Sequence, residues 1–241
     1  VKKLVRNYHT GIDNQVINFT ETSAGGGFIR EGDSMGDVYI TKVLKRDAAG
    51  NIAVGADGSL SSMDLPNGQR LKIGNTNPDF TLGWRNNISW KGLNLSFLIN
   101  ARVGGIVTSA TQAVLDQFGV SKATADARDR GYVEVAGGQK VDPHKYYEVV
   151  ANQQLMGYYY YSATNVRLQN VSLSYTLPKT LLGQGWPGVT VGLIANNLWM
   201  IYNKAPFDPE VAASTGTYGQ GSDYFSAPSL RNIGFSLKLN F

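Results

Sequence analysis

The 241-residue chain carries 22 basic and 18 acidic residues, a net charge of +4, and no cysteine. The lack of cysteine excludes disulfide bridges, thiolate metal ligands and a cysteine nucleophile. The 28 glycines, 13 tyrosines and 17% charged residues are typical of an extracytoplasmic β protein. The basic residues are scattered, which disfavours a nucleic-acid partner. No apolar run reaches the roughly 18 to 20 residues that a membrane helix needs.

The first elements in chain order are weakly patterned. The glycine-rich stretch SAGGGF at 23–28 is predicted to be a loop, because neither the Lys-Ser/Thr pair nor the helix of a phosphate-binding loop follows it. Residues 36–58 place two short apolar stretches on either side of DAAGN, which predicts a hairpin. Asp47, Asn51 and Asp57 lack the spacing of a calcium loop and are interpreted as turn formers.

Two long amphipathic strands follow. In PDFTLGWRNNISW and LNLSFLINARVGG, apolar residues occupy every second position. A period of two indicates strands with one apolar and one polar face. Lys91-Gly92 lies between them and predicts a two-residue turn. Each strand would be roughly a dozen residues long, more than the five or six usual in a soluble sheet.

A long excursion over residues 106–161 comes next. It contains the helix-like stretch SATQAVLDQFG and a second helix-like stretch, SKATADARDRG, which opens at Ser121. Serine is favoured at the N-cap, so Ser121 is predicted to begin the second helix.

The strand pattern resumes after the excursion, with two changes of parity. SATNVRLQNVSLSYTLP shifts its apolar positions by one at Gln169 or Asn170, which predicts a β-bulge there. VTVGLIANNLWMIY shifts at Asn196-Asn197, which would place three residues on the apolar side: Leu198, Met200 and Tyr202. The last strand, IGFSLKLNF, alternates regularly and ends on an aromatic ring.

The connections between strands alternate strictly between long and short. In order they are about 44–77, 91–92, 106–161, 178–188 and 203–227. Outer-membrane barrels sort their loops in this way, with brief periplasmic turns and long extracellular loops. The strand length also fits the roughly 9 to 11 residues that cross the membrane at a tilt. The sequence therefore predicts an all-β, antiparallel up-and-down transmembrane β-barrel segment, with 106–161 as an extracellular loop insertion.

A barrel assigns the two strand faces to lipid and to lumen. The apolar faces would point at outer-membrane lipid, and the polar faces would line the lumen with Arg85, Asn87, Asn94, Asn100, Arg102, Arg167 and Gln169. Aromatic residues gather at the membrane interfaces of such barrels. We expect Trp90 and Phe241 at the short-turn end, and Tyr158, Tyr159, Tyr160 and Tyr161 at the long-loop end.

Four stretches in order resemble the C-terminal part of SusC-like TonB-dependent outer-membrane transporters. They are IGNTNPDFTLGWRNNISWKGLNLSFLINARVGG, NVRLQNVSLSYTLP, NNLWMIYNKAPFDPE and LRNIGFSLKLNF, and the resemblance runs from about Gly32 to Phe241. It implies that residues 1–241 are the C-terminal part of one 22-stranded barrel, without the plug domain. It also implies a last strand whose terminal aromatic, Phe241, is read by the barrel-assembly machinery.

The resemblance further implies a function and its partners. The whole protein would be a Gram-negative outer-membrane importer of oligosaccharides or peptides, paired with a SusD-like surface lipoprotein and driven by the TonB complex through the N-terminal region. No cofactor is implied. Candidate contacts for substrate or lipoprotein are Tyr146, Tyr147, Arg102, Arg167, Asp208 and Glu210. The two tyrosines could stack on sugar rings, because an aromatic face suits the apolar face of a pyranose.

Two other functions stay open at the level of sequence. A secreted β-sandwich that binds carbohydrate would bury the apolar strand faces against a second sheet. A hydrolase would use Asp208 and Glu210 as a carboxylate pair. Catalysis has little support, because the only histidines, His9 and His144, accompany no nucleophile signature and lack the spacing of a metal site. We therefore expect no enzymatic activity.

Overall fold

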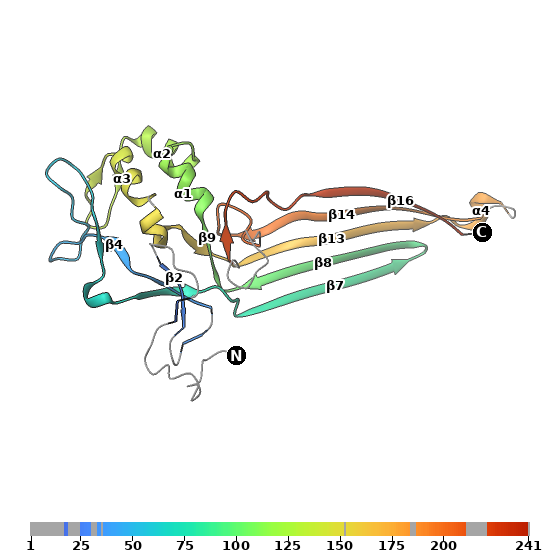
Figure 1. Cartoon of the computed structure of the whole chain (residues 1–241). Helices are drawn as coiled ribbons and strands as arrows, with labels where there is room; N and C mark the ends of the chain where they lie inside the picture. The colour runs from blue at the N-terminus through green and yellow to red at the C-terminus, as the bar shows by residue number, and fades with distance from the viewer. Residues whose placement is uncertain are drawn as a thin grey trace, which may run out of the picture. The chain divides into compact units, whose positions relative to one another are not determined.

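The computed structural model describes residues 17–18, 25–29, 33–34, 36–151, 153–183, 187–210 and 221–240. The chain divides into two compact units, and Figure 1 labels several of their elements. The strand unit comprises Pro78–Gly104, Ser162–Val211 and Ala227–Phe241. The loop unit comprises Val1–Asn77, Gly105–Tyr161 and Ala212–Ser226.

The strand unit is a five-stranded antiparallel sheet (Figure 1). Each of its strands pairs with the strand of this sheet that follows it in the chain. The order is β16-β14-β13-β8-β7. The bounds are β7 Phe80–Trp90, β8 Leu93–Val103, β13 Asn165–Thr176, β14 Gly188–Asn203 and β16 Asn232–Asn240, with a short helix α4, Lys179–Leu182, between β13 and β14. This arrangement confirms the predicted up-and-down order. One end of the sheet is called the long-loop end: β8 and β14 finish there, and β7, β13 and β16 start there.

The β7–β8 hairpin closes as predicted on Lys91 and Gly92. Both residues have positive φ, 45° and 86°. Two successive residues in this region match the twist of antiparallel strands and form the tightest hairpin turn. A Cβ on Gly92 would lie 2.9 Å from the carbonyl oxygen of Thr176, so the position requires glycine for space as well as for φ.

The predicted bulge in β13 is confirmed. Leu168 pairs with Ile99 of β8 whereas Asn170 pairs with Leu98, so Gln169 is the extra residue. In β14, Asn170 pairs with Asn196 but Leu168 pairs with Trp199. Two residues of β14, Asn197 and Leu198, thus lie opposite the single residue Gln169, so the apolar positions of β14 do not change parity there as predicted.

This longer bulge changes which side chains share a face. Directly opposed residues of an antiparallel pair lie on the same face. Trp199 is therefore on the apolar side with Leu168, while Met200 opposes Arg167 on the polar side. The predicted apolar position of Met200 is therefore wrong, whereas Leu198 lies within the bulge and has no opposed residue. Tyr202 does share the apolar side, opposite Val166, because a second register shift intervenes.

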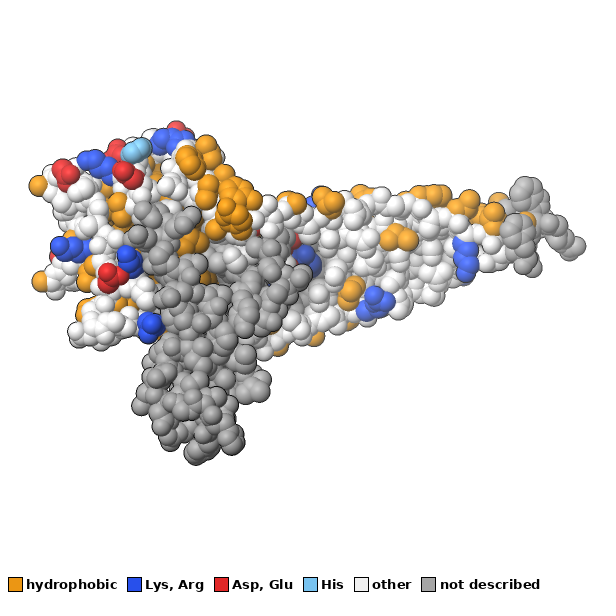
Figure 2. Space-filling view, in the orientation of Figure 1, with side chains coloured by type: hydrophobic (Ala, Val, Ile, Leu, Met, Phe, Trp, Pro, Cys, Tyr) orange, Lys and Arg blue, Asp and Glu red, His pale blue; other side chains and the backbone are white. Residues whose placement is uncertain are grey.

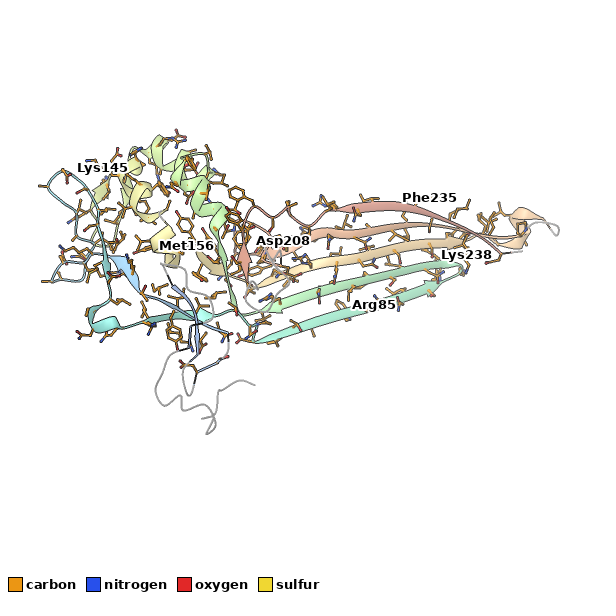
Figure 3. The ribbon with its side chains drawn as sticks, in the orientation of Figure 1. Arg85, Lys145, Met156, Asp208, Phe235 and Lys238 are labelled. Carbon is orange, nitrogen blue, oxygen red and sulfur yellow. The ribbon has the colours of Figure 1, made fainter. Side chains whose placement is uncertain are left out.

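The apolar face is continuous across all five strands. One row runs Ile88, Leu95, Leu173, Leu193, Phe235 through successive pairs. These side chains are not packed under another layer: Phe235, labelled in Figure 3, is 69% exposed and Ile88 is 52% exposed. An exposed apolar surface of this extent matches the lipid-facing band of a membrane barrel.

The opposite face of the sheet is polar and sparsely charged. Figure 2 shows basic side chains widely spaced on the strand unit, and Figure 3 labels Arg85 and Lys238. Neighbouring strands exchange side-chain hydrogen bonds, from Ser89 Oγ to Asn94 Oδ1 at 2.7 Å and from Asn170 Nδ2 to Asn196 Oδ1 at 2.8 Å. This face fits the predicted lumen.

In its described residues, the loop unit combines short sheets with three α-helices and two 3-10 helices. Its four-stranded sheet contains β1 Ile17–Asn18, β2 Gly25–Ile29, β3 Asp37–Ile40 and β6 Leu71–Asn75. The smaller sheets pair β4 Lys42–Leu44 with β5 Ser62–Asp64, β10 Val133–Glu134 with β11 Lys140–Val141, and β9 Ile106–Ser109 with β12 Tyr160–Ser162 and β15 Ser222–Asp223. The helical elements are α1 Ala110–Gln117, α2 Lys122–Arg130, α3 Pro143–Val150, η1 Pro66–Gly68 and η2 Gln153–Tyr159.

Local signals explain most of these elements. Ser121 caps α2 by accepting a hydrogen bond from Thr124 N at 3.1 Å, as predicted. Asp47 accepts hydrogen bonds from Ala49 N and Asn51 N, which confirms it as the turn former of the DAAGN hairpin. The loop prediction for 23–28 is wrong where the structure describes it, because Gly25, Gly26 and Gly27 pair with β3 and Phe28 pairs with β1.

The loop unit has its own hydrophobic core. Its buried residues are Leu44, Ile52, Leu60, Ala113, Val135, Val141, Val150, Ala151, Leu155 and Tyr159. They come from both 44–60 and 113–159, so the excursion of 106–161 packs with an earlier connection instead of forming a core alone. Within the described ranges, no helix has the length and apolar character needed to cross a bilayer.

Candidate functional site

Arg167 lies at the centre of the clearest polar cluster in the strand unit. It belongs to β13, two residues before the bulge, and is 5% exposed. Its Nη2 donates to Asp208 Oδ1 at 2.7 Å and lies 3.3 Å from Glu210 Oε2. Its Nε donates to Asn165 Oδ1 at 3.4 Å. The buried cation is thus compensated by two carboxylates, as a buried charge requires.

Asp208 is almost fully satisfied as a hydrogen-bond acceptor. Besides Arg167, it accepts from Glu210 N at 3.1 Å and from Ser229 Oγ. Burial would raise the pKa of its carboxyl, but the hydrogen bonds from Ser229 and Arg167 outweigh burial and hold the pKa below its usual value. Asp208 is therefore an ionised anchor, not a free acid.

These contacts join the two limbs of the β14–β16 connection where it leaves and rejoins the sheet. This place, formed by 203–210 and 228–232, is called the neck. Asp208 lies on its outgoing limb and Ser229 on its returning limb, and their side chains meet (Figure 3 labels Asp208). Asn203 stiffens the outgoing limb by donating to the carbonyls of Ala205 and Phe207, at 2.9 and 2.7 Å. The sequence motif FDPE thus structures the loop.

An open pocket of about 290 Å³ lies beside this cluster. It is bounded by the end of β14, by the neck and by the approach to β16. The lining residues are Arg167, Asn197, Trp199, Met200, Asn203, Asp208, Pro228, Ser229 and Arg231. Two arginines line the pocket. Arg167 is neutralised by Asp208, whereas Arg231 has no carboxylate partner among the lining residues.

The predicted contact residues are only partly brought together. Arg167, Asp208 and Glu210 form one cluster, and Arg102 lies one rung further toward the long-loop end, opposite Asn165. Tyr146 and Tyr147 belong to the loop unit, on α3, with their rings edge-on at 5.1 Å.

The two tyrosines differ in environment. Tyr146 packs against the core of the loop unit, and burial raises the pKa of its hydroxyl to about 12. Tyr147 is half-buried, and burial raises its pKa as well. Tyr146 therefore contributes to the packing of the loop unit, and the ligand contact predicted for the two tyrosines stays a prediction.

The predicted interfacial aromatics also divide. Tyr159 is 3% exposed and donates to Asp116 Oδ2 at 3.1 Å, so its place in an interfacial belt is wrong: it is a core residue. Burial raises the pKa of both Tyr160 and Tyr161 to about 12, and Tyr158 is 38% exposed. Trp90 is 66% exposed at the short-turn end, while Phe241 lies outside the described residues.

Two exposed aromatic residues lie on the apolar face at the long-loop end: the sequence pattern placed Tyr202 there but missed Trp199. Trp199 is 59% exposed and Tyr202 is 41% exposed. Their position matches that of an interfacial aromatic girdle. The run LWMIY carried the signal, but the length of the bulge decided which of its residues face outward.

The geometry gives little support to a hydrolase or to a metal site. Hydrolysis by a carboxylate pair requires two groups facing a substrate, whereas Asp208 and Glu210 both face Arg167. His144 is exposed on α3, 3.8 Å from Glu148, and His9 lies outside the described residues. Among the described residues, no three His, Cys, Asp or Glu side chains gather as metal ligands would.

Comparison with known proteins gives relatives of one kind. No protein-family model matches the chain. It is 26% identical over 234 residues to TonB-dependent receptor P3 of Formosa agariphila, covering 88% of this chain and 23% of that protein. It is 27% identical over 210 residues to TonB-dependent receptor P39 of the same organism, covering 84% of this chain and 20% of that protein.

Solved structures share the fold. The RagAB peptide importer in its open-open state matches with a TM-score of 0.66 at 18% identity, covering 99% of this chain and 25% of that one. Its closed-closed state matches with a TM-score of 0.60 at 19% identity, covering 92% and 24%. The chain thus spans about a quarter of the length of the proteins it matches. The chain is thus similar in sequence to part of two TonB-dependent receptors, and its fold is that of part of the RagAB importer structures.

Proposed function

We propose that the whole protein imports a nutrient across the Gram-negative outer membrane. The observation that carries this proposal is the antiparallel meander with one exposed apolar face, found in a chain related to TonB-dependent receptors. Such a face is stable only against lipid or another apolar surface. Residues 1–241 would supply part of one barrel and its loops.

The sandwich alternative fits this geometry poorly. A sandwich would bury the apolar faces against a second sheet. Leu237 is 58% exposed and Ile233 is 70% exposed, and most of the apolar row that ends at Phe235 is exposed as well. We therefore favour a lipid-facing barrel wall.

The cargo in this proposal is an oligosaccharide or a peptide. A peptide is favoured by the similarity of the fold to the RagAB peptide importer. A SusD-like surface lipoprotein would capture the cargo, and a TonB complex would supply energy through residues outside this chain. The barrel-assembly machinery would act on the C-terminal strand.

Within this chain, residues 106–161 would face the extracellular side. Tyr147 would contact cargo or lipoprotein directly, because it is only half-buried. Arg102 on the lumen face would line the route. Arg167, Asp208 and Glu210 would act mainly by fixing the neck of the β14–β16 connection, with Glu210 the most exposed of the three at 32% of its side chain.

The test is uptake by the native host. The gene is deleted, and growth is measured on single glycans and on defined peptides as the limiting nutrient, with the complete gene restored as control. The proposal predicts loss of growth on one nutrient class, which the restored gene repairs only when TonB is functional. Unchanged growth on every glycan and peptide of the panel would contradict it.

A further inference from the structure

β14 has an open edge at the long-loop end. β16 pairs with it only from Gly188 to Asn196. Beyond Asn196, β14 continues to Asn203 and remains paired with β13 on its other side. No strand in the described part of the chain pairs with 197–203 on the β16 side. Figure 1 shows β14 continuing past the start of β16.

The bulge explains why the edge is open. Asn197 has a φ of 50°, which turns β14 away from its earlier line. Its Nδ2 donates to the carbonyl of Leu230 at 3.2 Å and so holds the incoming chain at the bulge. Pro228 has no N–H to donate to a neighbouring strand. The pairing of β14 with β16 therefore begins only at Asn232.

The pocket of about 290 Å³ occupies this opening. Asn197, Trp199, Met200 and Asn203 line it along β14, and Pro228, Ser229 and Arg231 line it from the other side. In an antiparallel sheet, alternate residues of a strand direct their N–H and C=O groups away from the existing partner. Register shifts interrupt β14 at Asn197-Leu198 and at Ile201, so the edge presents main-chain donors and acceptors over two short stretches, Trp199-Met200 and Tyr202-Asn203.

We propose that this edge binds an extended peptide segment, which adds to β14 as a further strand. Main-chain groups spaced along a strand match another peptide backbone, whereas the hydroxyls of a sugar do not repeat at this spacing. Trp199, 59% exposed, offers an apolar contact for one ligand side chain. Arg231, unpaired within the lining, favours an acidic side chain or a terminal carboxylate.

As a cargo site, this edge rests on the proposed function of import, but binding to it can be measured separately. The whole transporter, purified with its lipoprotein partner, carries the photo-crosslinker p-benzoylphenylalanine in place of Trp199. The matched control carries the same crosslinker in place of Trp90, which is 66% exposed at the other end of the sheet. The probe is the peptide Thr-Val-Thr-Val-Thr-Glu.

Two further probes carry N-methyl groups on alternate residues, one at the odd and one at the even positions. Strand addition uses the N–H groups of one peptide edge, so one isomer should label position 199 about tenfold less than the parent peptide while the other labels it normally. Position 90 should stay unlabelled. Arg231→Gln should weaken labelling by the Glu-ending peptide but not by its Gln-ending counterpart with an amidated C-terminus.

Equal labelling by the two N-methyl isomers would overturn the proposal, as would no labelling by the parent peptide at millimolar concentration. Crosslinking of position 199 to the transporter's own chain in place of the peptide would also overturn it, since the edge would already be filled. Uptake of the same peptide by cells is scored independently. Uptake together with equal labelling by the two isomers would contradict the proposed binding site but not the proposed function. Isomer-dependent labelling without uptake would support the binding site and contradict the function.

Discussion

Arg167 and Asp208 are 41 residues apart in the sequence, yet Nη2 of one lies 2.7 Å from Oδ1 of the other. Only 6% and 7% of the two side chains is exposed. The pair joins the wall of the sheet to the outgoing limb of the β14–β16 connection, and Ser229 adds the returning limb. One buried ion pair thus fixes both the neck of the loop and one end of the β14 edge.

Removing one partner of this pair should open the neck. Asp208→Ala leaves the Arg167 cation buried with only Glu210, and breaking a buried pair costs about 3 kcal/mol. We expect the free energy of local opening, measured by hydrogen exchange over 203–210 and 228–232 in the whole transporter, to fall by about that amount. Glu210→Gln is the control and should cost under about 1 kcal/mol, because Glu210 is more exposed. Equal effects of the two substitutions would refute this role for Asp208.

Acid should weaken the same neck. The pKa of Asp208 is lower in the folded protein than in the unfolded chain. Its contribution is therefore complete above the unfolded pKa, near 4, and is lost as the pH falls through the folded value. Hydrogen exchange over the neck, corrected for the intrinsic rate, should show reduced protection at about pH 3 relative to pH 7. Asp208→Asn should remove this pH dependence, and a dependence that persists in the variant would assign it to another group.

The β7–β8 turn should respond in opposite directions to two neighbouring substitutions. Lys91→Asn places at φ 45° a residue that tolerates the left-handed region, so stability should stay equal or rise. Gly92→Ala adds a Cβ 2.9 Å from Thr176 O at a φ of 86° and should cost about 1 kcal/mol or more. Equilibrium unfolding in urea of the whole barrel in detergent measures both. A neutral Gly92→Ala would show that the turn adopts another conformation.

Tyr159 should behave as a core residue of the loop unit. Its hydroxyl donates to Asp116, a 5% exposed carboxylate that also accepts from Gln112 Nε2 at 2.8 Å. Tyr159→Phe removes one donor from a buried charge and should lower the stability of the loop unit by about 2 kcal/mol. Tyr158→Phe should change it by under about 0.5 kcal/mol. Hydrogen exchange of α1 and η2 reports both, and equal effects would return Tyr159 to an interfacial role.

The two faces of the sheet should differ in their contact with lipid. Leu95, Phe97 and Leu237 lie on the apolar face, and Asn94 lies on the other. Spin labels at the first three sites should be accessible to oxygen and shielded from a polar relaxation agent, with the reverse at Asn94. The labels are read in the transporter made by a Gram-negative host. Shielding of the three apolar sites from both agents would instead indicate a buried sandwich face.

The sequence determined those features that depend on neighbouring residues. A period of two sets the faces of β7, β8 and β16, because successive side chains of a strand alternate whatever the strand packs against. Lys91-Gly92 specified its turn because few residue pairs adopt two positive φ angles. Ser121 capped α2, and the parity change located the bulge at Gln169 or Asn170, of which Gln169 is the extra residue.

Only the tertiary structure decided the features that depend on distant pairing. The register with β13 gave the β14 bulge two residues, which turned Trp199 outward and Met200 inward. Tyr159 is buried because Asp116 and the core of the loop unit meet it. Arg167, Asp208 and Ser229 come together because the sheet and the loop neck bring separate stretches of chain within hydrogen-bonding distance. Periodicity can state which face a residue occupies, but not which distant residue will lie opposite it.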